Sequence, residues 1–163
     1  MKIGHIAYAD GGCPYNGVAA SSMYGSYKIF KLGEGVDRLP LIKDLVDQTP
    51  LIEDLRCNIQ YTGGGGHITN NCAEILSLHN LLNRLIADNL VSPGNGVVVF
   101  MDSQLVVNQM IGAYKVKQDH LRQLYKKIQM IFKKYETRYG CNLWEELSLQ
   151  WISGEDMKKI LGH

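Results

Sequence analysis

Apolar residues recur along the chain with two spacings, one helical and one typical of strands. Between residues 71 and 89, leucines occur every three or four positions, which predicts a helix with one buried face. Thr69 or Asn70 precedes this pattern as a candidate N-cap. Similar spacing, with serines at the start or glycines at the end, predicts further helices. The expected helices cover residues 71–89, 103–110, 121–140 and 153–163.

Short runs rich in β-branched and aromatic residues predict strands between the helices. The run Val97–Met101 is wholly apolar and follows a cluster of turn residues, which is typical of a buried strand. In the second run, alternate residues such as Tyr27 and Ile29 share one side, and we expect it to pair antiparallel with the first strand. The expected strands cover residues 2–9, 21–32, 57–62, 97–101 and 147–152.

The order of these elements, β-β-β-α-β-α-α-β-α, predicts an α/β protein with a mixed sheet covered by helices. The length fits a single domain over residues 1–163 that buries its own core. Residues 33–56 hold Pro40 and Pro50 and show no clear period. We therefore expect an insertion at about 33–56, with one short helix in it.

Composition narrows the function classes. The formal net charge is +1, so binding to nucleic acid has to rest on local patches rather than on a general basic field. No apolar run reaches the roughly 18 residues of a membrane span, and we expect no signal peptide at the start. The four cysteines are scattered without a Cys-x-x-Cys pair, which favours reduced thiols in a cytoplasmic protein.

Three carboxylates stand at the edges of predicted core elements. Asp10 ends the first strand before a glycine pair, Glu74 lies in the first turns of a helix, and Asp102 directly follows a strand. Each has an ordinary structural explanation when taken alone: a turn, the helix dipole or the cap of the next helix. Together they predict a converging set, and converging carboxylates repel one another unless cations bind them. Such oxygen ligands suit Mg²⁺, and two such ions support phosphodiester hydrolysis.

The two tryptophans admit two interpretations. Trp144 and Trp151 are either core residues or platforms on which nucleic-acid bases stack. We expect both to lie in the core, because tryptophan is highly buried on average.

Four sequence motifs follow one another along nearly the whole chain. They are Tyr-Ala-Asp-Gly-Gly-Cys at 8–13 with Asn-Gly at 16–17, Thr-Asn-Asn-Cys-Ala-Glu at 69–74, Asp-Ser-Gln-Leu-Val-Val-Asn-Gln at 102–109, and Gly-Ala-Tyr-Lys-Val-Lys at 112–117. In type and order they resemble the motifs of the type 1 ribonuclease H family. The last resembles the archaeal and bacterial members that lack a basic protrusion. The resemblance implies a ribonuclease-H-like fold, with a mixed five-stranded sheet and helices on both faces.

The resemblance also implies an endoribonuclease that cuts the RNA strand of RNA/DNA hybrids and leaves 5′-phosphate and 3′-hydroxyl ends. Asp10, Glu74 and Asp102 would hold two Mg²⁺ or Mn²⁺ ions. Lys115 and Lys117 would contact phosphates. A further group would contact the minor groove, where the 2′-hydroxyl distinguishes RNA from DNA. Its members are Gly11, Gly12, Asn16, Asn70, Asn71 and Gln104.

The chain departs from the family pattern at the fourth carboxylate. When the motif is aligned on Trp151, Leu161 stands where an Asp is expected, and a leucine side chain cannot bind a metal. Asp156 and His163 lie seven positions apart on one face of the last helix, so either is a candidate replacement. We favour His163, because it lies deeper along that helix and some nucleases of the wider fold use a histidine in this role.

Two other functions stay open on the sequence. The missing fourth ligand suits a catalytically weakened module that binds hybrids without turnover. The motifs also suit a related nuclease of the same fold that acts on another nucleic acid. We expect no membrane association and infer no obligate protein partner.

Overall fold

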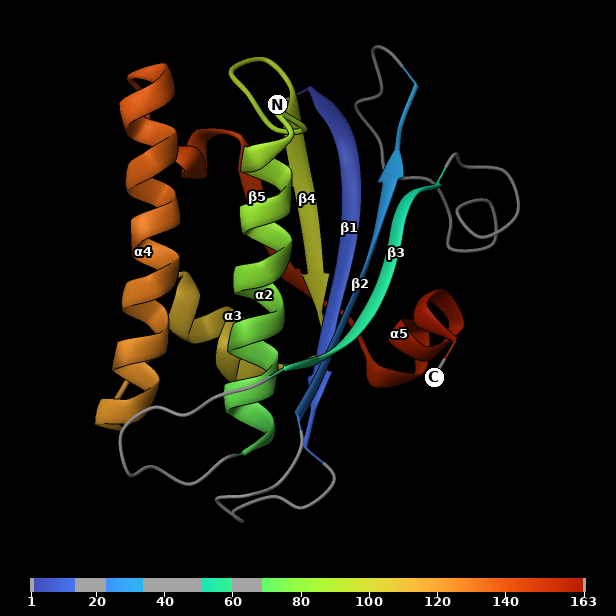
Figure 1. Cartoon of the computed structure of the whole chain (residues 1–163), viewed down its shortest axis with the longest axis vertical. Helices are drawn as coiled ribbons and strands as arrows, with labels where there is room; N and C mark the ends of the chain where they lie inside the picture. Colours follow the sequence, from blue (N-terminus) through green and yellow to red (C-terminus); the bar gives the residue numbers. More distant parts are fainter. Residues whose placement is uncertain (1, 14–22, 34–50, 60–68, 163) are drawn as a thin grey trace.

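A single mixed sheet forms the centre of the molecule (Figure 1). The computed structural model describes residues 2–13, 23–33, 51–59 and 69–162. The strands are β1 (Ile3–Gly12), β2 (Met23–Lys31), β3 (Leu51–Ile59), β4 (Gly96–Met101) and β5 (Leu147–Trp151). Their order in the sheet is β3-β2-β1-β4-β5. The strands β1, β4 and β5 run parallel, whereas β2 is antiparallel to both of its neighbours, which confirms the mixed five-stranded sheet.

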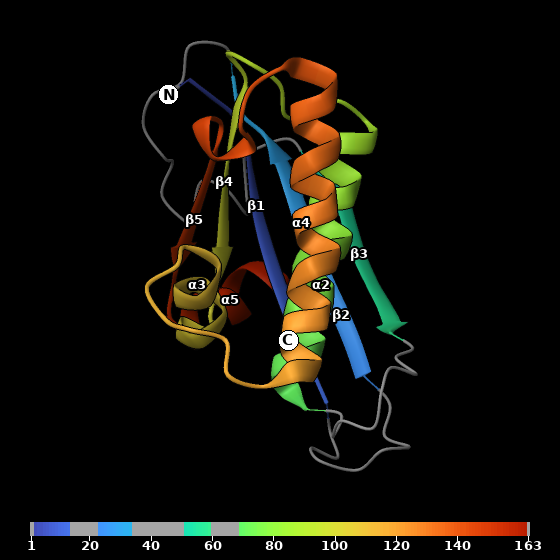
Figure 2. The ribbon, with the colours of Figure 1, turned by 90° about the vertical axis from the view of Figure 1, so that its left-hand side faces the viewer.

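Helices cover both faces of this sheet, as the resemblance implies (Figures 1 and 2). They are α2 (Asn70–Ala87), α3 (Gln104–Met110), α4 (Asp119–Tyr139), the short 3₁₀ helix η1 (Leu143–Glu145) and α5 (Gly154–Leu161). The long helices α2 and α4 lie side by side on one face, and α5 lies on the other (Figure 1). The helices that the sequence predicts between residues 71 and 163 correspond to α2, α3, α4 and α5, which confirms the α/β class.

The sheet separates two apolar cores of unequal size. Alternate side chains of β1 point to opposite faces, so Ala7 and Ala9 join the large core beneath α2 and α4. Ile6 and Tyr8 join a smaller core, where they pack with Met157 of α5. The fully buried β4 contributes to both cores, which explains why its sequence is apolar without alternation.

The predicted caps fix where the helices begin. Thr69 accepts a hydrogen bond from the Cys72 amide at 3.4 Å and so caps α2. Ser103 and Ser153 cap α3 and α5 in the same way, three residues before the donor amide. The helix α4 ends at its C-terminus with Gly140. This residue adopts φ 72°, a left-handed conformation that glycine accepts without strain.

The third strand begins earlier than the sequence predicts. We expected a strand from residue 57 and an insertion up to residue 56, but β3 already starts at Leu51. The charged residues that hid the strand pair with neighbouring elements. Tyr27 of β2 donates to Glu53 at 2.9 Å, and Lys28 lies 3.6 Å from Asp54. The remainder of the predicted insertion, 34–50, lies outside the described residues.

The prediction that both tryptophans lie in the core is wrong. Trp144 is 37% exposed and packs against Phe132, with ring centroids 5.0 Å apart. Trp151 is 45% exposed at the last position of β5. Trp144 lies in η1, the connection that precedes β5, and Trp151 is the last residue of β5. At neither position do the described apolar side chains bury the whole ring.

Candidate active site

Asp10 and Asp102 stand at the same level of the sheet. The strands β1 and β4 run parallel, and Ala9 pairs with Met101, so each acid directly follows a paired residue. Side chains alternate along β1, which puts Asp10 on the same face as Tyr8. The parallel pairing thus brings together two of the three predicted acids, although they are far apart in the sequence.

A glycine allows the start of α2 to approach β1 closely. A Cβ atom on Gly11 would overlap the main-chain carbonyl group of Ala73, so no larger residue fits without a shift. Glu74 follows Ala73 in the helix and therefore lies beside the end of β1. In the first motif, Asp10 provides one acid, and Gly11 leaves the space that lets Glu74 approach it.

Glu74 has a perturbed carboxyl group. Burial is the main cause that raises its pKa to about 7; a hydrogen bond with the Ser103 side chain lowers the pKa, and the charges of Asp102 and Asp10 raise it. Its Oε2 atom is buried and has no hydrogen-bond partner among the described residues. A divalent cation beside this oxygen would supply the missing contact and offset the repulsion among the three acids.

The three acids do not converge tightly on one point. Within the described ranges, no three His, Cys, Asp or Glu side chains stand close enough together to hold one ion. Asp10 Oδ1 accepts a hydrogen bond from the Gly11 amide at 2.9 Å, so this oxygen is turned towards its own main chain. The donor set is nonetheless oxygen-only and acidic, which is the chemistry that Mg²⁺ and Mn²⁺ accept. Binding of such an ion would require the carboxylates to turn towards it.

The first turn of α5 lies next to Asp102. A Cβ atom on Gly154 would be 3.6 Å from Asp102 Oδ2. Asp156, in the same turn, is close enough to Tyr8 that its charge adds to burial in raising the pKa of that phenol. Leu161 is only 7% exposed and packs in the small core, as expected of a residue that binds no metal. His163 lies outside the described residues.

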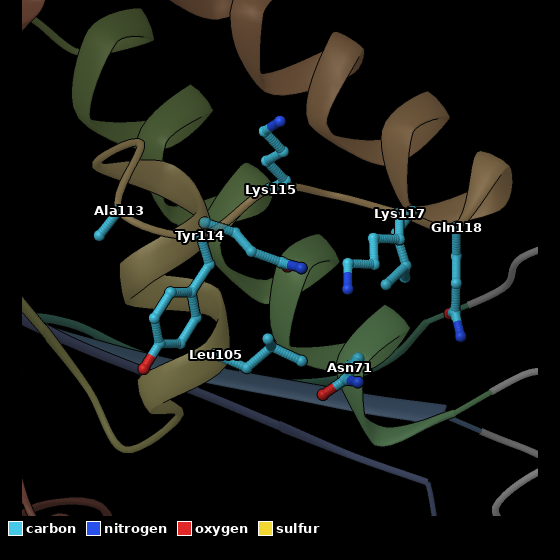
Figure 3. A pocket seen from close by; sticks show the side chains of 9 residues that line it. Asn71, Leu105, Ala113, Tyr114, Lys115, Lys117 and Gln118 are labelled. Carbon is cyan, nitrogen blue, oxygen red and sulfur yellow. The ribbon is translucent and has the colours of Figure 1, made fainter.

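A groove opens between α3, the start of α2 and the segment before α4 (Figure 3). It encloses about 530 Å³ and is lined by three of the predicted substrate-binding residues, Asn71, Lys115 and Lys117. In Figure 3, Lys117 extends towards Asn71. Two lysines at an open groove suit a polyanionic ligand.

The other predicted substrate residues occupy different positions. Gly12 is buried, and a Cβ atom there would overlap the ring of Tyr24, so close packing is the role that the structure describes for it. Asn70 accepts a hydrogen bond from the Cys13 amide at 2.7 Å and joins α2 to the end of β1. Gln104 is exposed at the start of α3. Asn16 lies outside the described residues, and the contacts of all four with a hybrid stay predictions.

Two features of the site were missed by sequence reasoning. Ser103 was expected only to begin a helix, with Asp102 as a possible cap. Ser103 is itself the cap, and its side chain also hydrogen-bonds to Glu74. Tyr125 of α4 lies near Glu74, whose charge adds to burial in raising the pKa of this phenol, and its hydroxyl donates to Gln109 at 2.8 Å. The sequence analysis did not single out Tyr125, since nothing in the sequence relates α4 to the acids.

Solved structures resemble this chain over most of its length. LC11-RNase H1 in complex with an RNA/DNA hybrid matches with a TM-score of 0.64 and 27% identity, over 93% of this chain and 86% of that chain. LC11-RNase H1, isolated from compost by a metagenomic approach, gives a TM-score of 0.62 and 25% identity, over 96% and 89%. RNase H1 from the halophilic archaeon Halobacterium salinarum gives 0.64 and 17%, over 95% and 89%, which supports the fold alone. No family model and no curated protein sequence matches the chain.

Sheet order, helix placement and these structures together define the class: the chain has the ribonuclease H fold. Within this fold, the resemblance to type 1 ribonuclease H that the four motifs predicted is confirmed by the two LC11-RNase H1 structures.

Proposed function

We propose that this protein is an endoribonuclease that hydrolyses the RNA strand of RNA/DNA hybrids, leaving 5′-phosphate and 3′-hydroxyl ends. The observation that carries the proposal is the geometry that brings the three acid-bearing segments together. Ala9 pairs with Met101 just before Asp10 and Asp102, and Gly11 lies against Ala73 just before Glu74. The match to LC11-RNase H1, whose structure was solved with an RNA/DNA hybrid, supports the choice of substrate.

The same three acids would hold two divalent ions, Mg²⁺ or Mn²⁺. The buried Oε2 of Glu74, without a partner among the described residues, supports this assignment. When bound, the ions supply an activated water and stabilise the leaving oxygen of the phosphodiester. The chain itself supplies acidic oxygens from three segments and partly buries Glu74.

The fourth metal ligand is Asp156, His163 or neither. The nearness of the α5 first turn to Asp102 supports Asp156. The expectation that His163 shares a helix face with Asp156 is wrong, because α5 ends at Leu161 and the left-handed Gly162 caps it. His163 itself, favoured on the sequence, lies outside the described residues and stays a candidate.

Hybrid binding would use the groove of Figure 3 and the surface around it. Lys115 and Lys117 would neutralise phosphates, which makes affinity depend on salt. Asn71 and Gln104 would hydrogen-bond to the minor groove, where their amides can both donate to and accept from a 2′-hydroxyl. Gly11, Gly12, Asn16 and Asn70 complete the proposed contact set.

We place this activity in the cytoplasm, because the scattered cysteines favour a reducing compartment. Among the helices that the structure describes, none has both the length and the apolar character needed to cross a membrane.

A second candidate is a module that binds hybrids but turns them over slowly. The burial of Leu161 in the small core, where the family pattern expects an acid, favours this alternative. It predicts tight binding of a hybrid with little cleavage in either metal.

Cleavage of a labelled RNA/DNA hybrid in Mg²⁺ or Mn²⁺ tests the proposal. Single-stranded RNA, duplex RNA and duplex DNA are the controls, and we expect cleavage of the hybrid alone. The Asp10→Asn variant should lose cleavage but bind the hybrid within a few-fold of wild type, because the charge is lost while the shape is kept. Preference for another nucleic acid would instead indicate a related nuclease, and binding without cleavage would indicate the weakened module.

A further inference from the structure

Trp151, the last residue of β5, contacts the main chain of a proposed metal-binding acid. Its indole Nε1 donates a hydrogen bond to the carbonyl oxygen of Asp102 at 3.0 Å. Pairing of β5 with β4 determines this position, because Trp151 lies opposite Met101, and Ile152 N donates to the Met101 carbonyl at 2.9 Å. The indole contact therefore lies one residue beyond the end of the β4–β5 ladder.

The Asp102 carbonyl lies between two regular hydrogen-bond patterns. Before it, the Met101 carbonyl belongs to the sheet; after it, the Ser103 carbonyl accepts from Val107 N at 3.1 Å in the first turn of α3. Among the described residues, the Asp102 carbonyl takes part in neither the sheet nor the helix hydrogen bonds. The Trp151 indole N–H donates to it instead. This bond fixes the orientation of the peptide group between Asp102 and Ser103.

The same dipeptide also reaches the third acid. The Ser103 hydroxyl accepts from Val106 N at 3.2 Å, and its side chain hydrogen-bonds to Glu74. A rotation of the peptide between Asp102 and Ser103 would therefore move one carboxylate and the partner of another together. A single donor on this peptide influences two of the three acids.

Packing does not account for a tryptophan at this position. Leu147 and Leu149 share its face of β5 and are buried, whereas Trp151 is 45% exposed. A half-exposed ring gains only part of the free energy of burial. What tryptophan adds over phenylalanine is the directed N–H group, which the Asp102 carbonyl accepts.

We propose that Trp151 is a positioning residue for the metal-binding carboxylates. Its indole N–H holds the Asp102–Ser103 peptide, and thereby limits how far Asp102 and Glu74 must turn to bind a divalent cation. The inference rests on the proposed function, in which these acids bind the metals. It assigns the ring no contact with the hybrid.

Three variants separate the hydrogen bond from the ring. Trp151→Phe removes the N–H group and keeps an aromatic ring, and Trp151→Ala removes both. Trp144→Phe is the matched control, because Trp144 is also partly exposed but packs on Phe132 in α4. The primary measurement is the thermal unfolding midpoint as a function of Mn²⁺ concentration, without nucleic acid, so that it does not depend on activity.

We expect Trp151→Phe to raise the half-saturating Mn²⁺ concentration by at least about five-fold, both in thermal unfolding and in hybrid cleavage. The KM for the hybrid should stay within about two-fold of wild type, since uniform substrate binding is intact. Trp151→Ala should behave like Trp151→Phe, and Trp144→Phe should match the wild type in both measurements.

A half-saturating Mn²⁺ concentration that Trp151→Phe leaves within about two-fold of wild type would overturn the inference. So would a Trp151→Phe variant that matches the wild type while Trp151→Ala raises KM, because that pattern indicates base stacking. A wild-type protein that binds Mn²⁺ but cleaves no hybrid would contradict the proposed function, and the metal titrations would still decide the role of Trp151.

A second measurement keeps Trp151 in place, in case its replacement unfolds the protein. In Trp144→Phe, Trp151 is the only tryptophan of the chain. Mg²⁺ should shift its emission with the same half-saturating concentration as the thermal midpoint, and an added Asp102→Asn change should abolish the shift. An emission that Mg²⁺ leaves unchanged while the midpoint rises counts against the inference.

Discussion

The main chain of Ala73 in α2 lies directly against Gly11 in β1, with no room for a side chain between them. The buried Ser77 hydroxyl donates to the Ala73 carbonyl at 2.7 Å, so this carbonyl is held within its helix. The contact sets the separation between the helix that carries Glu74 and the strand that carries Asp10.

Replacing Gly11 with Ala should therefore damage stability and activity together. The added methyl group forces α2 away from β1, and such overpacking costs about 1–3 kcal/mol of unfolding free energy. Displacement of Glu74 should lower hybrid cleavage at least about ten-fold. Urea unfolding and steady-state cleavage measure the two effects. Because the overlap is with a carbonyl group, adding Ala73→Gly should not restore activity, and full restoration would contradict this account.

Glu74 predicts a pH dependence of stability in the metal-free protein. Its folded-state pKa of about 7 lies above the ordinary 4.5, so the folded protein binds the proton more tightly than the unfolded chain. This contribution is fully present below pH 4.5 and is lost as the pH rises through 7. The unfolding free energy in a chelator should fall over this range in the wild type and fall less in Glu74→Gln. Equal pH slopes for the two proteins would assign the effect to another group.

The same protonation should oppose metal binding. Mg²⁺ must displace the proton of Glu74 below the pKa of about 7, so the rise in thermal midpoint on adding Mg²⁺ should be larger at pH 8 than at pH 6. A midpoint shift that is equal at both pH values would remove Glu74 from the ligand set.

Gln104 should act in substrate recognition rather than in chemistry. It is exposed at the start of α3, and its amide suits the 2′-hydroxyl of the RNA strand. Gln104→Ala should raise KM more than it lowers kcat, as expected for lost uniform binding. Gln123→Ala, an exposed change on α4, is the control and should alter neither constant. A fall in kcat at unchanged KM would count against the assignment.

Metal preference and pH distinguish the two candidates for the fourth ligand. A free imidazole titrates near 6.5 and a carboxylate near 4, so with His163 as ligand, activity should fall at mildly acidic pH more steeply than in His163→Asp. Imidazole also favours Mn²⁺ over Mg²⁺ more than a carboxylate does. The wild type should then show the larger Mn²⁺/Mg²⁺ activity ratio, and His163→Ala should lose most activity with both ions.

Asp156 gives the opposite pattern. If it is the ligand, Asp156→Asn should be inactive while His163→Ala keeps wild-type activity. If neither change lowers activity, three carboxylates suffice and the last helix serves only in packing, as Leu161 already does.

The sequence predicted the elements whose signals are local. The α2 helix has a long leucine period and a capping threonine, so its start was predicted correctly. The β3 strand was not, because Glu53 and Asp54 break any apolar run and find their partners on β2 and α2 only in the folded sheet. Edge strands of this kind depend on neighbours that a one-dimensional pattern does not show.

The site divides in the same way. Asp10, Glu74 and Asp102 were predicted because each belongs to a motif of contiguous residues. The hydrogen bond from Trp151 to Asp102 was not, because it depends on the register between β4 and β5. Side-chain roles that arise from strand register require the three-dimensional pairing.

The parallel pairing of β1 with β4 also orders events during synthesis. Within this sequence, Asp10 is synthesised well before its neighbour Asp102 and the strand that carries Trp151. A nascent chain that ends before β4 therefore has one side of the site and not the other. It also lacks Lys115 and Lys117, so the proposed phosphate contacts become possible only after both strands that carry the acids have been made.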